Sequence, residues 1–302
     1  DITLNVQALN NTAVTIFNSS AHYLYLGSTE KFDMAIFDLD TLGSLGALTW
    51  EYSSGTPAWT EFTPSIDREE PDGIAYGFTE DGAESFAPQL LADWATLTVN
   101  SVNIYWVRVR STASVTTAPT VKRIQMRALN AYATTQEVFE FLQLEGVYST
   151  PSSSVTDFTS STIPSKSSVQ AYISGAQSEI DYKTRKSWRP NVAYNEHYDF
   201  NFMGIRLNRR GAKRIFKVQI WEGDSYGTLK EGRSNEYFFN PDTGIVYFSR
   251  YFFLPARFGS FQSLAARYGG GEFIAPVRIS YQYGDNVNVD SREGGYVHEL
   301  TR

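Results

Sequence analysis

The densest group of chemically useful side chains in the sequence is a run of five cations within nine residues. Guanidinium and ammonium groups at this density can contact the phosphates of DNA or the carboxylates of an acidic partner. The alternative interpretation is a solvated hairpin tip, Asn208 to Ala212, between two strands. The candidate contacts for DNA or an acidic partner are therefore Arg206, Arg209, Arg210, Lys213 and Arg214.

A second basic group closes the stretch AQSEIDYKTRKSWRP, residues 176–190. Glu179 and Lys183 stand four residues apart with the acid first, which is a favourable pair on a helix. Cations in the last turn of a helix also suit the helix dipole. The group therefore needs no ligand to explain it. We expect Trp188 and Arg189 to fix the helix end against the β-rich segment that follows.

Carboxylates offer less specific chemistry. The loop from Asp67 to Gly73 could hold Ca²⁺ through its acidic oxygens, but it lacks an alternating Asp spacing and is more typical of a solvated turn. A glycosidase needs a pair of carboxylates, and strand-borne pairs exist. Any acidic β-sandwich offers as many, so the pairs do not favour catalysis. They are Asp38 with Asp40 and Glu51 with Glu61.

Residue types that carry most catalytic and metal chemistry are scarce. The chain has no cysteine, which rules out disulfides, thiolate metal sites and cysteine nucleophiles. Its three histidines, His22, His197 and His298, lie far apart in no ligand-like spacing. The run 269–271 of three glycines lacks the Gly-Lys-Ser/Thr ending of a phosphate loop. We expect no enzyme, no catalytic residue, no cofactor and no metal.

Four tryptophans of the N-terminal half admit two interpretations. Aromatic platforms can stack on sugar rings, but an indole is also the largest block available for filling a sandwich core. We favour core filling for Trp50, Trp59, Trp94 and Trp106.

Composition and charge point to a β-rich chain with two modules. The 302 residues suffice for one large or two medium domains, and the aromatic content of 15% favours strands. Residues 1–130 hold 7 Lys and Arg against 15 Asp and Glu, a net charge of −8; the other 19 and 18 give +1. Such a step indicates modules with different surroundings. No apolar run approaches 18 residues, so we expect no membrane partner.

Residues 1–130 are predicted to form a jelly-roll-like β-sandwich, because short apolar runs alternate with turn residues. In the strand at 104–110, Arg108 and Arg110 should face outward. The core-facing residues are either Ile104 and Trp106 or their neighbours Tyr105, Val107 and Val109. Strands are expected at 14–17, 23–26, 34–39, 47–52, 85–88 and 104–110.

Two helices follow. Thr134 and Glu137 form a capping-box pattern at the start of a connecting helix in 131–148, which Gly146 can end. Residues 149–164 are a Ser/Thr/Pro-rich linker. A second helix, 165–187, is expected to end at Pro190. Its apolar stripe should pack inside the domain or against a neighbour and comprises Val169, Tyr172, Ile173, Ala176 and Ile180.

The rest of the chain is β-rich again. Residues 240–244, NPDTG, predict a turn, because proline fixes φ, aspartate caps locally and glycine takes positive φ. They should join two strands into a hairpin. The expected fold class is mainly β with a small α component: the sandwich, then a C-terminal α+β domain over 165–302. Strands are expected at 215–221, 237–239, 244–248 and 277–283.

Two regions resemble known virion proteins. Residues 21–125 resemble a β-sandwich module of tailed-virus virion proteins, through YLGSTEKFD (25–33), LTWEY (48–52), Pro88 with DWAT (93–96), YWVRVR (105–110) and TAPTV (117–121). Residues 164–284 resemble head–tail connector (adaptor) proteins of tailed phages and related archaeal viruses. The pieces are EIDYKTRKSW (179–188), EHYD (196–199), NPDTGIV (240–246) and VRISYQYG (277–284). The family often has glycine where Arg185 stands, and an arginine can continue the helix there.

The resemblance implies a helical core with an inserted β domain, assembled as a homo-oligomeric ring of typically twelve copies beneath the portal protein. It implies a structural protein of the virion neck, assembled in the host cytoplasm, that surrounds the passing genomic DNA without catalysis. Partners would be further copies of the chain, the portal protein and tail or neck proteins. The sandwich would face outward. The polar tail 285–302 stands where the family has further helices and should order on a neighbouring subunit or the portal.

Within such a ring, the charges around the end of the second helix would meet the next subunit. The expected docking residues are Glu179, Asp181, Lys183, Arg185, Lys186, Trp188 and Arg189. One alternative is a neck or tail appendage protein whose sandwich binds host surface glycans. A cell-wall-degrading virion enzyme fits less well, because the chain lacks cysteine and is poor in histidine.

Overall fold

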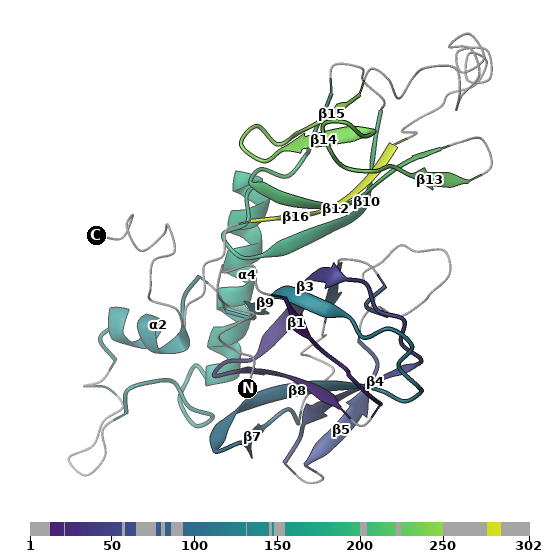
Figure 1. Cartoon of the computed structure of the whole chain (residues 1–302). Helices are drawn as coiled ribbons and strands as arrows, with labels where there is room; N and C mark the ends of the chain where they lie inside the picture. Colours follow the sequence, from purple (N-terminus) through teal and green to yellow (C-terminus); the bar gives the residue numbers. More distant parts are fainter. Residues whose placement is uncertain are drawn as a thin grey trace.

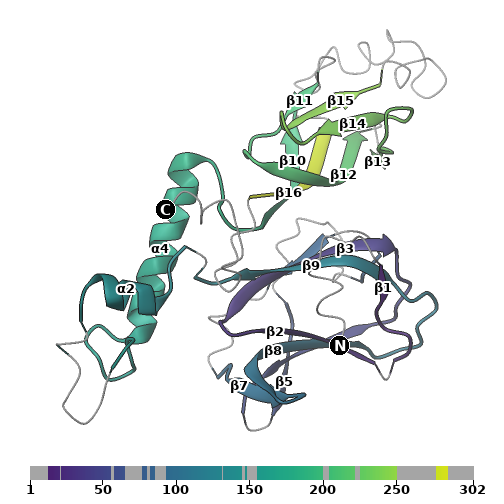
Figure 2. The same cartoon turned by 60° about the vertical axis from the view of Figure 1, so that its left-hand side comes forward.

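The chain folds into an N-terminal β-sandwich, a helical part and a second β part (Figures 1 and 2). It is mainly β with a small α component, as predicted. The computed structural model describes residues 13–20, 22–55, 58–64, 77–79, 82–85, 93–130, 132–144, 147, 155–199, 204–221, 225–249 and 277–284.

The sandwich consists of two antiparallel sheets, which we call inner and outer by their position relative to the rest of the molecule. The inner sheet has the order β1 (Val14–Thr15), β9 (Thr120–Ala128), β3 (Phe32–Thr41), β6 (Gly82–Ser85). The outer sheet has the order β2 (Tyr23–Ser28), β8 (Val102–Ser111), β4 (Leu48–Ser53), β5 (Trp59–Phe62), and β7 (Thr96–Val99) also pairs with β8.

The sandwich core lies between these sheets. Phe37 of the inner sheet and Val107 and Val109 of the outer sheet are fully buried, and each such side chain contributes roughly 1.5–3 kcal/mol through burial. This decides the register of β8: Val107 and Val109 face the core, while Trp106, Arg108 and Arg110 face outward. Arg108 and Arg110 therefore point as predicted, and the second of the two expected alternations is correct.

The helical part begins with the predicted capping box. Thr134 accepts from the Glu137 amide at 3.1 Å, and the Glu137 carboxylate accepts from the Thr134 amide at 2.8 Å. The helix, α2 (Thr135–Phe141), ends before Gly146, which lies outside the described residues. Phe139 is buried edge-on against Phe158. Phe158 belongs to the predicted linker 149–164, so at least the end of that segment packs on the helices.

The second helix, α4 (Lys166–Thr184), buries only part of the predicted stripe. Val169 and Ile173 are buried, whereas Tyr172, Ala176 and Ile180 are exposed. The third buried position is a polar one, Gln177, which is 1% exposed. Burial therefore follows a narrow row four residues apart, because α4 rests on few neighbours. The apolar residues beside this row remain open to solvent.

The end of α4 also differs from the prediction. Arg185 does not continue the helix, and Pro190 does not end it. Arg185 has φ 51° and ψ 29°. This is the left-handed conformation in which a helix usually ends at a glycine. The chain therefore turns away directly after Thr184. Pro190 instead precedes the first strand of the second β part.

The second β part contains two sheets. Residues 240–244 form the predicted turn, since the Gly244 amide donates to the Asn240 carbonyl at 2.9 Å and Gly244 has φ 65°. The hairpin prediction is confirmed. One sheet has the order β10 (Asn191–Tyr198), β16 (Val277–Tyr283), β12 (Ala212–Trp221), β13 (Tyr226–Thr228); the other has the order β11 (Ile205–Arg206), β15 (Ile245–Phe248), β14 (Tyr237–Asn240).

The inner sheet of the sandwich is joined to the second β part by specific contacts. Met34, Ile36 and Ala83 of the sandwich form a small apolar cluster with Val192 and Phe216 packed on it. The Tyr194 hydroxyl accepts from the Ala83 amide at 2.5 Å. Arg127 donates to Asp33 and, at 2.8 Å, to Asn191. The two β parts therefore share an interface of apolar and polar contacts.

We expect Gln177→Ala to destabilise the fold strongly. The Gln177 amide donates to the Leu129 carbonyl at 3.0 Å and accepts from the Tyr132 amide at 2.7 Å, which ties α4 to the end of β9. Truncation leaves both backbone groups without partners, at a cost of about 2–4 kcal/mol in the free energy of unfolding. Urea denaturation measures the change. The neighbouring exposed Ser178→Ala is the control, and equal losses for the two variants would contradict the role of Gln177.

Candidate functional site at the basic junction

The structure brings the two basic groups of the sequence together. Lys186 and Arg210 form an isolated parallel bridge, and the Arg210 amide donates to the Arg185 carbonyl at 3.3 Å. The end of α4 and the loop before β12 therefore lie side by side. We call this region the basic junction; it comprises Arg185, Lys186, Arg189, Arg206, Arg209, Arg210, Lys213 and Arg214.

The loop that carries these cations is not the tip of a hairpin. Ile205 and Arg206 form β11, which pairs with β15, whereas Ala212 begins β12, which pairs with β13 and β16. The loop 207–211 thus crosses from one sheet to the other. The sequence interpretation as a hairpin tip is wrong, because two adjacent apolar strands need not pair with each other.

Backbone hydrogen bonds hold this loop on buried tyrosines. The Asn208 amide donates to the Tyr198 hydroxyl at 3.1 Å, and the Arg209 amide donates to the Tyr281 hydroxyl at 3.3 Å. Both hydroxyls also donate to the Glu196 carboxylate. Burial, together with the bonds to Glu196, raises the pKa of Tyr198; for Tyr281 burial and the neighbouring Tyr198 raise the pKa most. These tyrosines therefore stay protonated and keep the loop in place.

Several cations of the region are paired with acids. Arg214 lies 2.6 Å from Asp38, and Arg209 lies 3.9 Å from Glu196. Arg189 is 9% exposed and lies 3.6 Å from Asp181. Lys183 lies 2.5 Å from Glu179 and forms the predicted pair on the surface of α4.

Three exposed arginines of the junction have no such partner. Among the residues that the structure describes, no carboxylate lies within ion-pairing distance of Arg185, Arg206 or Arg210. Lys186 differs from them, since its ammonium lies 3.6 Å from the centre of the Trp188 ring. The junction therefore presents unbalanced positive charge to solvent, which favours contact with an anionic surface.

The segment after α4 is clamped from two sides. The Trp188 amide donates to the Tyr132 hydroxyl at 2.8 Å, and that hydroxyl donates to Asp181. On the other side, Gly284 packs so closely that an added Cβ would lie 2.2 Å from the Arg189 carbonyl oxygen. Trp188 and Arg189 thus contact the helical part and the end of β16. Whether they also dock a neighbouring subunit stays a prediction.

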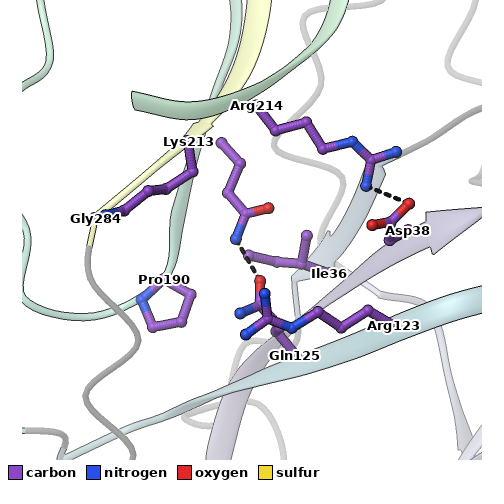
Figure 3. A pocket seen from close by; sticks show the side chains of 9 residues that line it. Ile36, Asp38, Arg123, Gln125, Pro190, Lys213, Arg214 and Gly284 are labelled. Atoms are coloured by element: carbon purple, nitrogen blue, oxygen red, sulfur yellow. Dashed lines mark hydrogen bonds and ion pairs between the residues drawn. The ribbon is translucent and has the colours of Figure 1, made fainter. Parts of the chain in front are cut away.

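A cavity of about 390 Å³ opens beside the junction, between the sandwich and the second β part (Figure 3). Arg214 from β12 and Arg123 from β9 enter it from opposite walls. Burial lowers the pKa of Arg123, and the negative charge of Asp38 opposes this shift. Arg123, Lys213 and Arg214 against Asp38 leave the lining net positive. The lining residues are Ile36, Asp38, Arg123, Gln125, Pro190, Lys213, Arg214, Gln282 and Gly284.

Sequence reasoning missed Arg123, because it lies about 90 residues before the basic loop. A signal was present: Arg123, Gln125 and Arg127 recur every second residue in β9, while Ile124 belongs to the core. A polar row of this kind on an inner sheet indicates that something polar covers the sheet. Gln125 and Arg127 indeed contact Gln282 and Asn191.

Most of the other candidate carboxylates have structural partners or lie outside the described residues, whereas Glu61 is exposed beside Glu51 on β5. Asp38, Asp40 and Glu51 are ion-paired with Arg214, Lys122 and Arg108. The acidic loop 67–73 and the glycine run 269–271 lie outside the described residues. Where the structure describes the chain, no three histidine, aspartate or glutamate side chains are grouped so that they could hold a metal ion.

Comparison with known proteins identifies no relative: no family model, no curated protein and no solved structure matches the chain. Across the described ranges, no helix combines the length and apolar character needed to cross a membrane.

We expect the contribution of Tyr132 to stability to disappear at high pH. Burial and the bond to Asp181 raise its pKa to about 12, whereas an unfolded tyrosine titrates near pH 10. Below about pH 10 both states keep the proton and the contribution is complete. Between about pH 10 and 12 only the unfolded chain loses the proton, so the contribution falls by about 1.4 kcal/mol per pH unit.

Urea denaturation of wild type and Tyr132→Phe at several pH values from 8 to 12 measures this effect. The stability difference between the two should narrow above pH 10. Tyr172→Phe, which removes an exposed hydroxyl from α4, controls for the substitution itself. If the stability difference between wild type and Tyr132→Phe stayed constant from pH 8 to 12, the raised pKa of Tyr132 would be contradicted.

Proposed function

We propose that this chain is a structural protein of a tailed virus, a head–tail connector that forms a ring between portal and tail and surrounds the DNA channel. The proposal rests on the resemblance of residues 164–284 to connector proteins and on one structural observation, the exposed apolar surface of the helical part. The chain acts as a building block in this proposal and carries out no catalysis.

The exposed large apolar side chains of the described chain are concentrated in the helical part. Twelve large apolar side chains are exposed in the described chain, and seven of them lie between residues 141 and 182. Ile163 is 88% exposed, Phe141 85% and Tyr182 83%. A monomer rarely leaves such residues uncovered together, and they are typical of an interface with another chain. The others are Leu142, Val147, Tyr172 and Ile180.

A ring of identical chains supplies a cover for this surface. Rings arise from head-to-tail contacts, in which one patch of a subunit meets a different patch of the next. Of the predicted docking charges, Glu179 and Lys183 border the exposed row Tyr172, Ala176 and Ile180 on α4, whereas Arg189 is buried. Apolar contact with charged flanks is the composition expected of such an interface.

The unpaired arginines of the basic junction suit the DNA that a connector surrounds. Contact with phosphates through Arg206 and Arg210 would be independent of base sequence, as a conduit requires. An acidic partner protein is the alternative occupant of the same charges.

We expect Tyr182→Lys and Ile163→Lys to block assembly without unfolding the chain, because both side chains are exposed in the single chain. Wild type should elute as a ring-sized particle in size-exclusion chromatography with light scattering, and electron microscopy should show rings. Each variant should elute as a single chain. Leu42→Lys, at a residue 52% exposed on the sandwich, is the matched control. A wild-type chain that stays monomeric at all concentrations, with no rings in micrographs, would contradict ring formation.

We expect the double variant Arg206→Ala, Arg210→Ala to weaken binding to duplex DNA of any sequence. Losing two phosphate contacts reduces the slope of log affinity against log salt concentration by about 2. Fluorescence anisotropy at 20–200 mM NaCl measures it. The control is Lys122→Ala with Lys166→Ala, two lysines held in ion pairs with Asp40 and Asp157. DNA binding with an unchanged slope in the first variant would assign the arginines to another partner.

A further inference from the structure

The outer sheet of the sandwich carries an aromatic face that lies apart from the basic junction. The strand registers align Tyr25 with Arg108 and Glu51, and Gly27 with Trp106. In Figures 1 and 2 this sheet lies on the side of the sandwich away from β10–β16. Its aromatic side chains are exposed or half-buried, and they are Tyr23, Tyr25, Trp59 and Trp106.

This placement corrects the sequence interpretation of the tryptophans. Trp50 and Trp94 are each 3% exposed and fill the core, as favoured. Trp59 and Trp106 lie on the opposite side of the outer sheet and do not fill it. Two indoles on a solvent-facing sheet have no core to stabilise, so their presence requires another explanation.

Trp106 is held as a flat platform. A Cβ added at Gly27 would lie 2.3 Å from Cζ3 of Trp106, so the indole rests directly on the backbone of β2. Its N–H donates to the Leu97 carbonyl at 2.9 Å and fixes the ring orientation. The Tyr25 ring stands at 89° to it, with centroids 6.3 Å apart. A planar ring with a perpendicular wall is a preformed seat for a flat, partly apolar ligand.

Beside this platform, Arg108 is fixed in an aromatic sandwich. Its guanidinium lies 4.0 Å from the Trp59 ring centre and 4.5 Å from that of Tyr23. Two bonds of 2.9 Å bind it to the Glu51 carboxylate. Arg108 follows Trp106 by two residues, which is about 7 Å along a strand. One disaccharide can therefore reach the platform and the charged pair together.

The hydrogen-bonding groups of this face are the fixed pair Arg108 and Glu51, whose side chains are each 16% exposed. The face thus combines stacking surface with hydrogen-bonding groups in fixed positions.

The charges select the kind of ligand. By strand register Arg108 and Arg110 share the face with Glu51 and Glu61, so cations and carboxylates balance. Residues 1–130 carry a net charge of −8. An acidic module with a balanced face disfavours DNA and acidic polymers. The ligand that suits this face is uncharged. A neutral pyranose fits, because its ring has a flat apolar face with hydroxyl groups around the edge.

We propose that the outer sheet binds a neutral saccharide chain, with one pyranose ring stacked on Trp106 and hydroxyl groups bonded to Arg108 and Glu51. The site is independent of ring assembly and of DNA contact. It would give the virion protein a means of holding a carbohydrate surface.

The full-length protein, fluorescently labelled, is applied to an array that carries neutral oligosaccharides of glucose, galactose, mannose and N-acetylglucosamine next to sialylated and sulfated ones. Calorimetry with the best neutral oligosaccharide follows. Wild type should bind a neutral one. Trp106→Ala and Trp59→Ala should each weaken binding at least tenfold, with Tyr247→Ala, a tyrosine of β15 that is 37% exposed, as the control that leaves binding intact.

Circular dichroism checks that each variant folds. If Trp106→Ala does not fold, Tyr25→Ala replaces it, because that ring is 37% exposed and forms the wall beside the platform. Capture of no neutral glycan, capture of charged glycans alone, or equal affinity in the folded platform variants would each overturn the proposal. Since none of these outcomes affects ring formation, failure here is distinct from failure of the connector proposal.

Discussion

The position of the helical part depends on one buried amide. Among the described residues, α4 buries only Val169, Ile173 and Gln177 along its length. Burial of two aliphatic side chains contributes roughly 3–6 kcal/mol, but the hydrophobic effect has no direction. The two hydrogen bonds of Gln177 do have direction, and they set both the rotation and the height of α4 against the end of β9.

The path of the chain directly after α4 follows from that placement. Because Arg185 takes the left-handed conformation, the chain reverses and runs beside Arg210. Gly284, with φ 90°, lets β16 end directly against the Arg189 carbonyl, where any side chain would collide. Backbone contacts of three segments thus create the basic junction. The cations gather there because the backbone brings them together, and nearby acids offset only some of their charge.

Local chemistry made part of this fold predictable. The capping box at Thr134 and the turn at 240–244 depend only on residues close in sequence, and both form as predicted. Sheet partners are set by distant residues, so the alternation of the strand at 104–110 left two registers open, which differ by one residue. That one-residue difference decides whether Trp106 is a core residue or a surface platform. Similarly, helical periodicity identified an apolar stripe on α4 but could not reveal that a glutamine would take its third buried position.

The sequence identified most residues of the candidate site but not how they come together in space. Charge density alone identified both basic groups, yet their contact, and the entry of Arg123 into the cavity, depend on how β9, β12 and α4 meet. Conversely, the conformation of Arg185 contradicts the usual preference for glycine at a left-handed helix end. Arg185 takes this conformation without the help of glycine, and its side chain adds a positive charge to the junction.

The charge distribution also constrains how the proposed ring could be oriented. DNA in a central channel attracts the unpaired arginines of the junction and repels the sandwich, whose first 130 residues carry a net charge of −8. The electrostatic energy is therefore lowest with the junction toward the channel and the sandwich away from it. In that orientation the inner sheet stays covered by the second β part, and the outer sheet, with its balanced charges and exposed rings, faces the surroundings. In the proposed ring, contact of the basic junction with DNA would thus leave the aromatic face on the side of the sandwich away from the channel.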